Sequence, residues 1–184
     1  MACRPRWSHG PTLGVTATAR TRPAASRRGR TLGHHAGAPG GFSFPDDASL
    51  RTSGTIALAD ASNNRIRFLS PQGTVVGRIG NGADAHDPPV SIARPDGEAP
   101  LANSDILGSE INGSWVDEYT RSGPLVWTVH LASVNDPSDP RQLGADLFLM
   151  TDDNPPGEGR VVEFTHEGQV TWRYDARAGD DMLE

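Results

Sequence analysis

Residues 54–76 read GTIALADASNNRIRFLSPQGTVV, and this stretch decides the fold. Two apolar runs, 55–59 and 65–68, flank an Asp-Ala-Ser-Asn-Asn turn, and a third run, 74–76, follows a Gln-Gly dipeptide. Short runs rich in β-branched residues and bounded by Gly, Asn and Asp are typical of β-strands. A glycine between two such runs supplies the positive φ of a tight hairpin. The stretch therefore predicts short antiparallel strands joined by hairpins.

The same pattern occurs twice more along the chain. With a shift of fifty residues, Gly73 matches Gly123, and in the third copy it matches Gly168. Three or four short strands that recur at this period are typical of the blades of a β-propeller. We therefore predict an all-β fold, a partial β-propeller of about three blades. The predicted blades cover residues 45–79, 95–129 and 137–174.

The blades are expected to stack, because a single blade cannot bury both of its faces. Trp127 and Trp172 occupy matching positions in the third run of their blades, which predicts apolar packing between neighbouring blades. Propellers usually have 4–8 blades, and this sequence shows three. We therefore expect a fragment, or a ring that another copy completes, with self-association through open blade edges.

The charge of the chain is divided between two regions. Residues 1–44 hold seven Arg and no acidic residue, without apolar periodicity, which predicts a disordered Arg-rich leader. Residues 45–184, the predicted propeller repeats, hold ten Arg and all 23 acidic residues. An acidic body disfavours nucleic-acid binding, which depends on cationic contacts to phosphate. No apolar run approaches the length of a membrane span, and the single Cys3 excludes an internal disulfide framework.

Residues 54–66 resemble the NHL repeat, in which a hydrophobic strand ends in Ala-Asp and an Asn-Asn-Arg turn opens the next strand. Residues 105–110 and 168–174 look like the related PQQ-like and arylsulfotransferase-like propeller repeats of bacteria. The resemblance covers residues 45–184 and implies the propeller fold, but propellers host unrelated activities. It also makes an extracytoplasmic location plausible, although the leader shows no working signal peptide. The compartment is left open.

Three carboxylates recur at one position per predicted blade: Asp60, Glu110 and Asp152. In a ring, equivalent positions lie on a circle about the axis, where three carboxylates could hold a hard cation through oxygen ligands. The stronger interpretation is structural, because an Asp after a strand commonly caps N–H groups of the following turn. Asp47 and Asp139 also recur, beside prolines where strands begin, and the same capping role is expected there.

His86 and Asp87 lie in the connection between the first two blades, which is longer than the others. A His beside an acid could act as a general base with an orienting partner, whereas a loop His is more often simply solvated. No motif supports a catalytic residue, and the resemblance carries none to a position of this sequence. Cofactors and metals therefore remain open at this point, with Asp60, Glu110, Asp152, His86 and Asp87 as candidate ligand-binding residues.

Three hypotheses for function follow. The first is a non-enzymatic propeller module that binds a protein or a small molecule on one face. The second is part of an arylsulfotransferase-like or lyase-like propeller enzyme, and the third is a truncated reading frame with no independent function. A concave central site with converging His or Arg side chains would favour the second hypothesis over the first.

Overall fold

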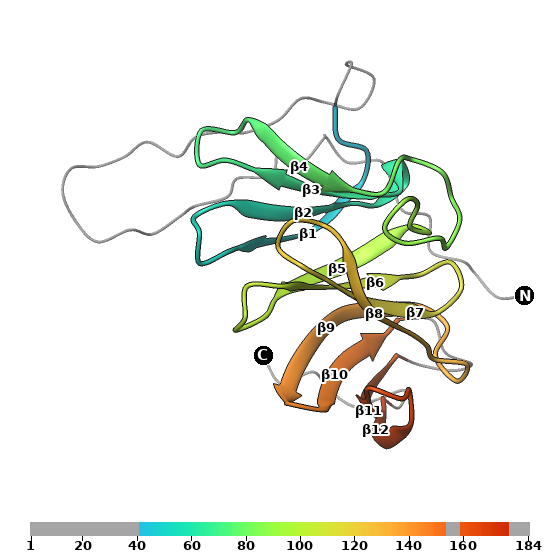
Figure 1. Cartoon of the computed structure of the whole chain (residues 1–184). Coiled ribbons are helices and arrows are strands. Elements are labelled where there is room, and N and C mark those ends of the chain that lie inside the picture. Colours follow the sequence, from blue (N-terminus) through green and yellow to red (C-terminus); the bar gives the residue numbers. More distant parts are fainter. Residues whose placement is uncertain (1–40, 154–158, 177–184) are drawn as a thin grey trace, which may run out of the picture. The chain divides into compact units, whose positions relative to one another are not determined.

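The computed structural model describes residues 41–153 and 159–176, which lie in one compact unit of the chain, residues 33–184 (Figure 1). The expected leader up to residue 40 falls outside the described residues, as do residues 154–158 and 177–184. The described part is all β, apart from one 3₁₀ turn, η1 (Ala61–Asn63). Among these residues no helix is long and apolar enough to cross a membrane.

Twelve strands form three four-stranded antiparallel sheets, in which every strand pairs with its neighbour in the sequence. The strands are β1 (Pro45–Leu50), β2 (Ile56–Asp60), β3 (Arg65–Leu69), β4 (Val75–Ile79), β5 (Pro95–Pro100), β6 (Ile106–Glu110), β7 (Trp115–Tyr119), β8 (Leu125–His130), β9 (Pro137–Gly144), β10 (Leu147–Asp152), β11 (Arg160–Thr165) and β12 (Val170–Asp175). We call β1–β4 sheet 1, β5–β8 sheet 2 and β9–β12 sheet 3. The predicted fold class, a partial β-propeller, is confirmed.

The hairpin turns follow from the local sequence. Gly73, Gly123 and Gly168 adopt φ of 87°, 112° and 78°, as the predicted hairpins require. Each of these glycines donates its N–H to the carbonyl oxygen three residues earlier, at Ser70, Thr120 and Thr165 respectively. Three equivalent turns therefore connect the third and fourth strands of the three sheets.

The first strands of the three sheets lie next to one another, β1 beside β5 and β5 beside β9. Each of these strands has an irregular register at the position of its Pro-Asp or Asp-Pro motif: between Pro45 and Ala48, between Pro95 and Glu98, and between Ser138 and Arg141. The recurring acids of this motif therefore gather where the three strands meet.

Two apolar cores hold the sheets together, one at each interface. Sheets 1 and 2 bury a cluster that includes Ile66, Ile106 and Tyr119. Sheets 2 and 3 bury a second cluster that includes Phe148 and Phe164. Burial of apolar surface contributes about 25 cal/mol per Å², so stacking against a neighbouring sheet stabilises each sheet.

The two matched tryptophans have different surroundings. Trp127 packs between sheets 2 and 3, where its ring stacks on Phe148 with centroids 5.3 Å apart and its Nε1 donates to the carbonyl oxygen of His166. Trp172, in the equivalent strand β12, is 50% exposed. The expected packing between blades is therefore confirmed for Trp127 and wrong for Trp172, because no further sheet among the described residues covers that face of sheet 3.

Candidate metal site

Asp60, Glu110 and Asp152 are the last residues of β2, β6 and β10, and all three side chains are buried. Each carboxylate accepts a hydrogen bond from a main-chain N–H seventeen residues earlier in the sequence: those of Ser43, Ala93 and Asn135. Each of the three carboxylates therefore hydrogen-bonds to the segment that precedes the first strand of its own sheet. The expected capping of the following turn is wrong: the main-chain N–H groups that these carboxylates cap belong to the segment before each sheet.

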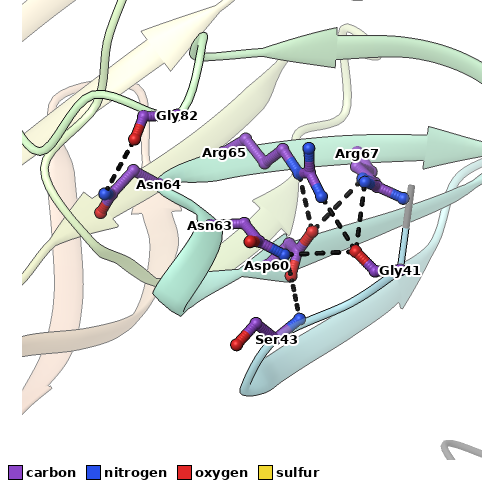
Figure 2. Close-up of polar contacts among 8 residues, drawn as sticks. All are labelled: Gly41, Ser43, Asp60, Asn63, Asn64, Arg65, Arg67 and Gly82. Carbon is purple, nitrogen blue, oxygen red and sulfur yellow. Dashed lines mark hydrogen bonds and ion pairs between the residues drawn. The ribbon is translucent and has the colours of Figure 1, made fainter. Parts of the chain in front are cut away.

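Figure 2 shows the arrangement in sheet 1, where two arginines surround Asp60. Arg65 Nε donates to Asp60 Oδ2 at 2.7 Å, and Arg67 Nε lies 3.3 Å from the same oxygen. Both guanidinium groups also donate to the carbonyl oxygen of Gly41. Residues 41–44, which composition alone assigns to the leader, are therefore bound to sheet 1.

Sheet 3 repeats this arrangement with a single arginine. Asp152 accepts the N–H groups of Asn135 and Asp136, and Arg160 binds the carboxylate through Nε at 2.8 Å and Nη2 at 2.6 Å. Arg160 also donates to the carbonyl oxygen of Ser133. A buried carboxylate is costly unless it is paired and hydrogen-bonded, and both requirements are satisfied here.

Sheet 2 departs from this pattern. The residue directly opposite Asp60 is Arg65 and that opposite Asp152 is Arg160, but the residue opposite Glu110 is Trp115. Two residues further along β7, at the register position of Arg67, stands a second acid, Asp117. Glu110 thus has a buried carboxylate beside it at a position that holds a guanidinium in sheet 1.

His86, Glu110 and Asp117 converge, with one ligand atom from each within 4.8 Å of the others. His86 Nδ1 lies 3.2 Å from Glu110 Oε2, which also accepts the Ala93 N–H at 2.6 Å. Glu110 Oε1 and Asp117 Oδ1 are buried and have no hydrogen-bond partner among the described residues. Buried polar atoms of this kind require an explanation, and an unobserved ion is one of the standard ones.

Neighbouring side chains fix the orientation of two of these groups. The His86 ring stacks on the Trp115 indole, with centroids 3.9 Å apart and an interplanar angle of 6°. Tyr119 donates its hydroxyl to Asp117 Oδ2 at 2.8 Å, which leaves Asp117 Oδ1 free. Such outer contacts orient the ligands of metal sites in proteins.

The pKa shifts of His86 and Glu110 favour the binding of a cation by the cluster. Burial lowers the pKa of His86, which favours the neutral imidazole that coordinates metals. Burial, and then the neighbouring Asp117, raises the pKa of Glu110 to about 9, so without a cation one proton is shared by the two acids at neutral pH. A divalent cation would replace that proton. One imidazole and two carboxylates fit a transition metal such as Mn²⁺ or Zn²⁺.

The structure brings together only some of the predicted site residues. Glu110 and His86 meet, but Asp60 and Asp152 stay within their own sheets, paired with arginine. Asp87 is exposed and its backbone closes a turn with Ser91, so the acid next to His86 Nδ1 is Glu110 rather than the adjacent Asp87. Sequence reasoning missed Asp117. The signal for it was an acid at a register position that holds Arg67 in sheet 1.

A second group of acids lies where β1, β5 and β9 meet. Burial raises the pKa of Asp46 to about 7, with contributions from Asp96 and Asp139. Asp47 accepts the N–H groups of Ala48 and Glu98, so the expected capping by this residue includes one contact between sheets. These acids are neighbours of one another and add to the pH dependence of the fold.

The stability of the metal-free protein is expected to fall as the pH rises from 6.5 to 9. Burial raises the pKa of Glu98 to about 7, Asp46 is raised to about 7 and Glu110 to about 9. The stability that such a carboxyl contributes is complete below its unfolded pKa of about 4 and is lost progressively as the pH rises to its folded pKa. Between pH 6.5 and 9 the loss therefore comes mainly from Glu110. A thermal unfolding series in EDTA should show a decrease in Tm of about 5 °C or more. A Tm that is constant or rises over this range would contradict these pKa directions.

The fold is similar to that of known enzymes, at low sequence identity. Virginiamycin B lyase from Staphylococcus aureus, as the selenomethionine protein, gives a TM-score of 0.55 at 16% identity over 74% of this chain and 42% of that chain. Its catalytically inactive variant, solved with quinupristin, gives 0.57 at 15% identity over 84% and 46%. A streptogramin B lyase structure gives 0.52 at 16% identity over 72% and 40%.

The chain spans less than half the length of each of these structures. No family model matches it, and a search of the curated proteins finds no match. At these identities the likeness concerns the fold alone, so the NHL and PQQ-like resemblance remains a prediction. The comparisons agree with the three antiparallel sheets: the chain has the architecture of part of a β-propeller.

Proposed function

We propose that this chain is a β-propeller binding module that holds a divalent cation through His86, Glu110 and Asp117. The observation that carries the proposal is the convergence of His86, Glu110 and Asp117, with one ligand atom of each within 4.8 Å of the others. Among the described residues no arginine neutralises the two buried carboxyl groups of this cluster. In sheets 1 and 3 an arginine neutralises the equivalent carboxylate. In sheet 2 the cation takes the place of that arginine.

The proposed cation also provides coordination positions at which the module can bind a ligand. Three protein ligands leave positions in the coordination sphere open, as in metal sites that bind water or substrate. His86 is the most accessible of the three, with 17% of its side chain exposed against 2% for Glu110. A ligand with a carboxylate, carbonyl or imidazole group would therefore approach past His86, on the face formed by the 80–94 connection and the β6–β7 turn.

Metal titration tests the proposal directly. The purified full chain, treated with EDTA and dialysed, is titrated with MnCl₂ or ZnCl₂ by calorimetry at pH 7.5. One cation per chain is expected, with protons released on binding. At a free cation concentration of about 100 times Kd, the fold gains about 2.7 kcal/mol, which appears as a rise in Tm.

Three variants sharpen the test. Loss of a partner outside the ligand sphere already weakens metal sites by about 10- to 100-fold, so Asp117→Asn should weaken binding by at least about 100-fold. Trp115→Arg places opposite Glu110 the arginine that stands opposite the carboxylate in sheets 1 and 3. The new guanidinium should take the place of the cation and abolish cation binding. Asp146→Asn is the control, because Asp146 is an exposed acid of sheet 3 that lies beside His166 and not beside the cluster. Unchanged affinity in Asp117→Asn would overturn the proposal.

A second candidate function is part of a lyase-like propeller enzyme. It is favoured by the likeness in fold to the streptogramin lyases and by a neutral imidazole beside an acid pair, an arrangement that can move a proton. Incubation of the metal-loaded chain with quinupristin, followed by mass spectrometry, tests it. Conversion of quinupristin to a product, lost in His86→Ala, would support this candidate. Intact quinupristin would contradict it and leave the binding module as the proposal.

A further inference from the structure

The other end of sheets 1 and 2 holds a pocket with a different chemistry. Its volume is about 600 Å³, within the range of small-molecule sites. It lies between the β1–β2 turn, the β3–β4 hairpin and two turns of sheet 2. The lining comprises three arginines, five hydroxyl side chains and a short apolar wall: Arg51, Arg78, Arg121, Thr52, Ser53, Thr55, Ser104, Ser122, Phe68, Val76 and Gly77.

We propose that this pocket binds the oxyanion group of a small organic molecule, a carboxylate or a phosphate monoester attached to an apolar part. The site is separate from the candidate metal site, because Ser104 of the pocket lies just before β6 whereas Glu110 ends that strand. The two sites therefore lie at opposite ends of the strands. The inference does not depend on the proposed cation.

The placement of Arg51 supports an anion site. Its side chain is nearly buried, with Nη2 donating to the carbonyl oxygen of Ser104 at 2.6 Å and Nη1 to that of Arg121 at 3.4 Å. Its guanidinium lies 5.0 Å from the centroid of the Phe68 ring. These contacts hold one guanidinium at the wall of the pocket, between the two sheets.

The three arginine side chains of the pocket form no ion pair with an acidic side chain of the described residues. Burial lowers the pKa of Arg51, and the charge of Arg121 lowers it further. Within residues 41–153 and 159–176, no carboxylate forms an ion pair with Arg51, Arg78 or Arg121, whereas five other arginines do form such pairs. Three arginines without a carboxylate partner among the described residues therefore line one pocket, although the chain has a net charge of −6.

Glu98 and Asp105, the two acids whose charges raise the pKa of Arg51, have hydrogen-bond partners of their own. Glu98 accepts hydrogen bonds from the N–H and hydroxyl of Ser49. Asp105 accepts the N–H of Arg121 and the amide of Asn103. Neither side chain lines the pocket, so within the described residues Arg78 and Arg121 line it without a carboxylate partner. Arg51 and the five hydroxyl groups already form hydrogen bonds with protein groups. Arginine binds oxyanions well because its planar donors match two oxygens at once.

The apolar side chains of the pocket favour an organic anion over an inorganic one. Phe68 and the exposed Val76 stand beside the cationic side chains. An inorganic anion would contact only the arginines and hydroxyls, whereas an organic anion would also cover this apolar surface. We therefore expect phenyl phosphate or benzoate to bind more tightly than inorganic phosphate.

The test titrates the ¹⁵N-labelled full chain with phenyl phosphate, benzoate, inorganic phosphate and, as a neutral probe, benzyl alcohol. Phenyl phosphate should shift the Nε signals of the pocket arginines and bind about tenfold more tightly than inorganic phosphate, with affinity that falls as salt rises. Saturable binding of benzoate as well would indicate a general oxyanion site, and binding of phenyl phosphate alone would indicate a phosphate monoester. Benzyl alcohol should not bind.

Matched arginine variants decide the outcome. Arg78→Gln and Arg121→Gln should each weaken phenyl phosphate binding by about tenfold, the effect of one charge-assisted contact. Arg173→Gln is the control, because Arg173 is an exposed arginine of β12 paired with Asp175. Absence of saturable binding, or equal losses in all three variants, would overturn the proposal. An affinity that is the same with and without MnCl₂ would separate this pocket from the metal site.

Discussion

Asp152→Asn is expected to lower the free energy of unfolding by about 3 kcal/mol, the cost of removing one partner from a buried ion pair. Asp152 is fully buried and holds Arg160 together with the N–H groups of Asn135 and Asp136. The asparagine keeps the shape but removes the charge. Arg160 is then left without its carboxylate, and the segment that leads into β9 loses part of its anchor.

Glu110→Gln, at the equivalent end of β6, is expected to change the free energy of unfolding by no more than about 1 kcal/mol in EDTA at pH 7.5. The raised pKa of Glu110 means that the carboxyl of the metal-free protein already carries a proton. A glutamine amide is close in shape to that neutral acid, and it can donate to the free Oδ1 of Asp117.

Urea denaturation of the two variants beside the parent measures this difference. The comparison is well matched, because both residues end the second strand of a sheet and both accept a main-chain N–H seventeen residues earlier. Equal losses of stability in the two variants would mean that Glu110 is ionised and neutralised by a group other than a proton.

Gly97→Ala is expected to destabilise the protein by about 3 kcal/mol, at the upper end of the usual cost of overpacking. A Cβ at this position would lie 2.4 Å from the backbone N of Asp139 and 2.8 Å from its Cα. Both neighbours are main-chain atoms of β9, so no side-chain rotation can relieve the contact. The backbones of β5 and β9 would have to separate, which would open the interface between sheets 2 and 3.

Gly144→Ala provides the control for this prediction. The nearest atom to a Cβ at Gly144 is the Leu147 Cβ at 3.9 Å, an ordinary contact. The free energy of unfolding of Gly144→Ala should match that of the parent or exceed it slightly, because alanine loses less conformational freedom than glycine on folding. Urea midpoints of the two variants test the pair, and a Gly97→Ala midpoint equal to that of Gly144→Ala would show that the two backbones have room to separate.

The repeat was readable from the sequence because strand patterning and turn chemistry are local. The Gly of each hairpin and the acid at the end of each second strand recur with the same neighbours, and this fixes the order of the strands within a sheet. Trp127 was also predicted correctly to pack between blades. These predictions needed only the period of the apolar residues and the φ that glycine supplies.

The candidate site could be predicted only in part, because it joins residues that are distant in sequence. Glu110 and His86 were singled out separately, one by its repeat position and the other as a His in a long connection. Their contact depends on the path of the 80–94 segment back over β7, where His86 stacks on Trp115. A neighbouring acid in the sequence, Asp87, was therefore a poor guide to the acid that faces the imidazole.

The amino-acid sequence alone determined that the chain folds into three units of short antiparallel strands, since alternation and turn residues act within a few positions. Tertiary structure decided which carboxylates are neutralised and which are not. That outcome depends on the residue across the strand pair, arginine beside Asp60 and Asp152 but tryptophan beside Glu110, and on burial, which raises the free energy of an unpaired charge. The pocket with Arg51, Arg78 and Arg121 likewise exists only because two sheets bring separate turns together.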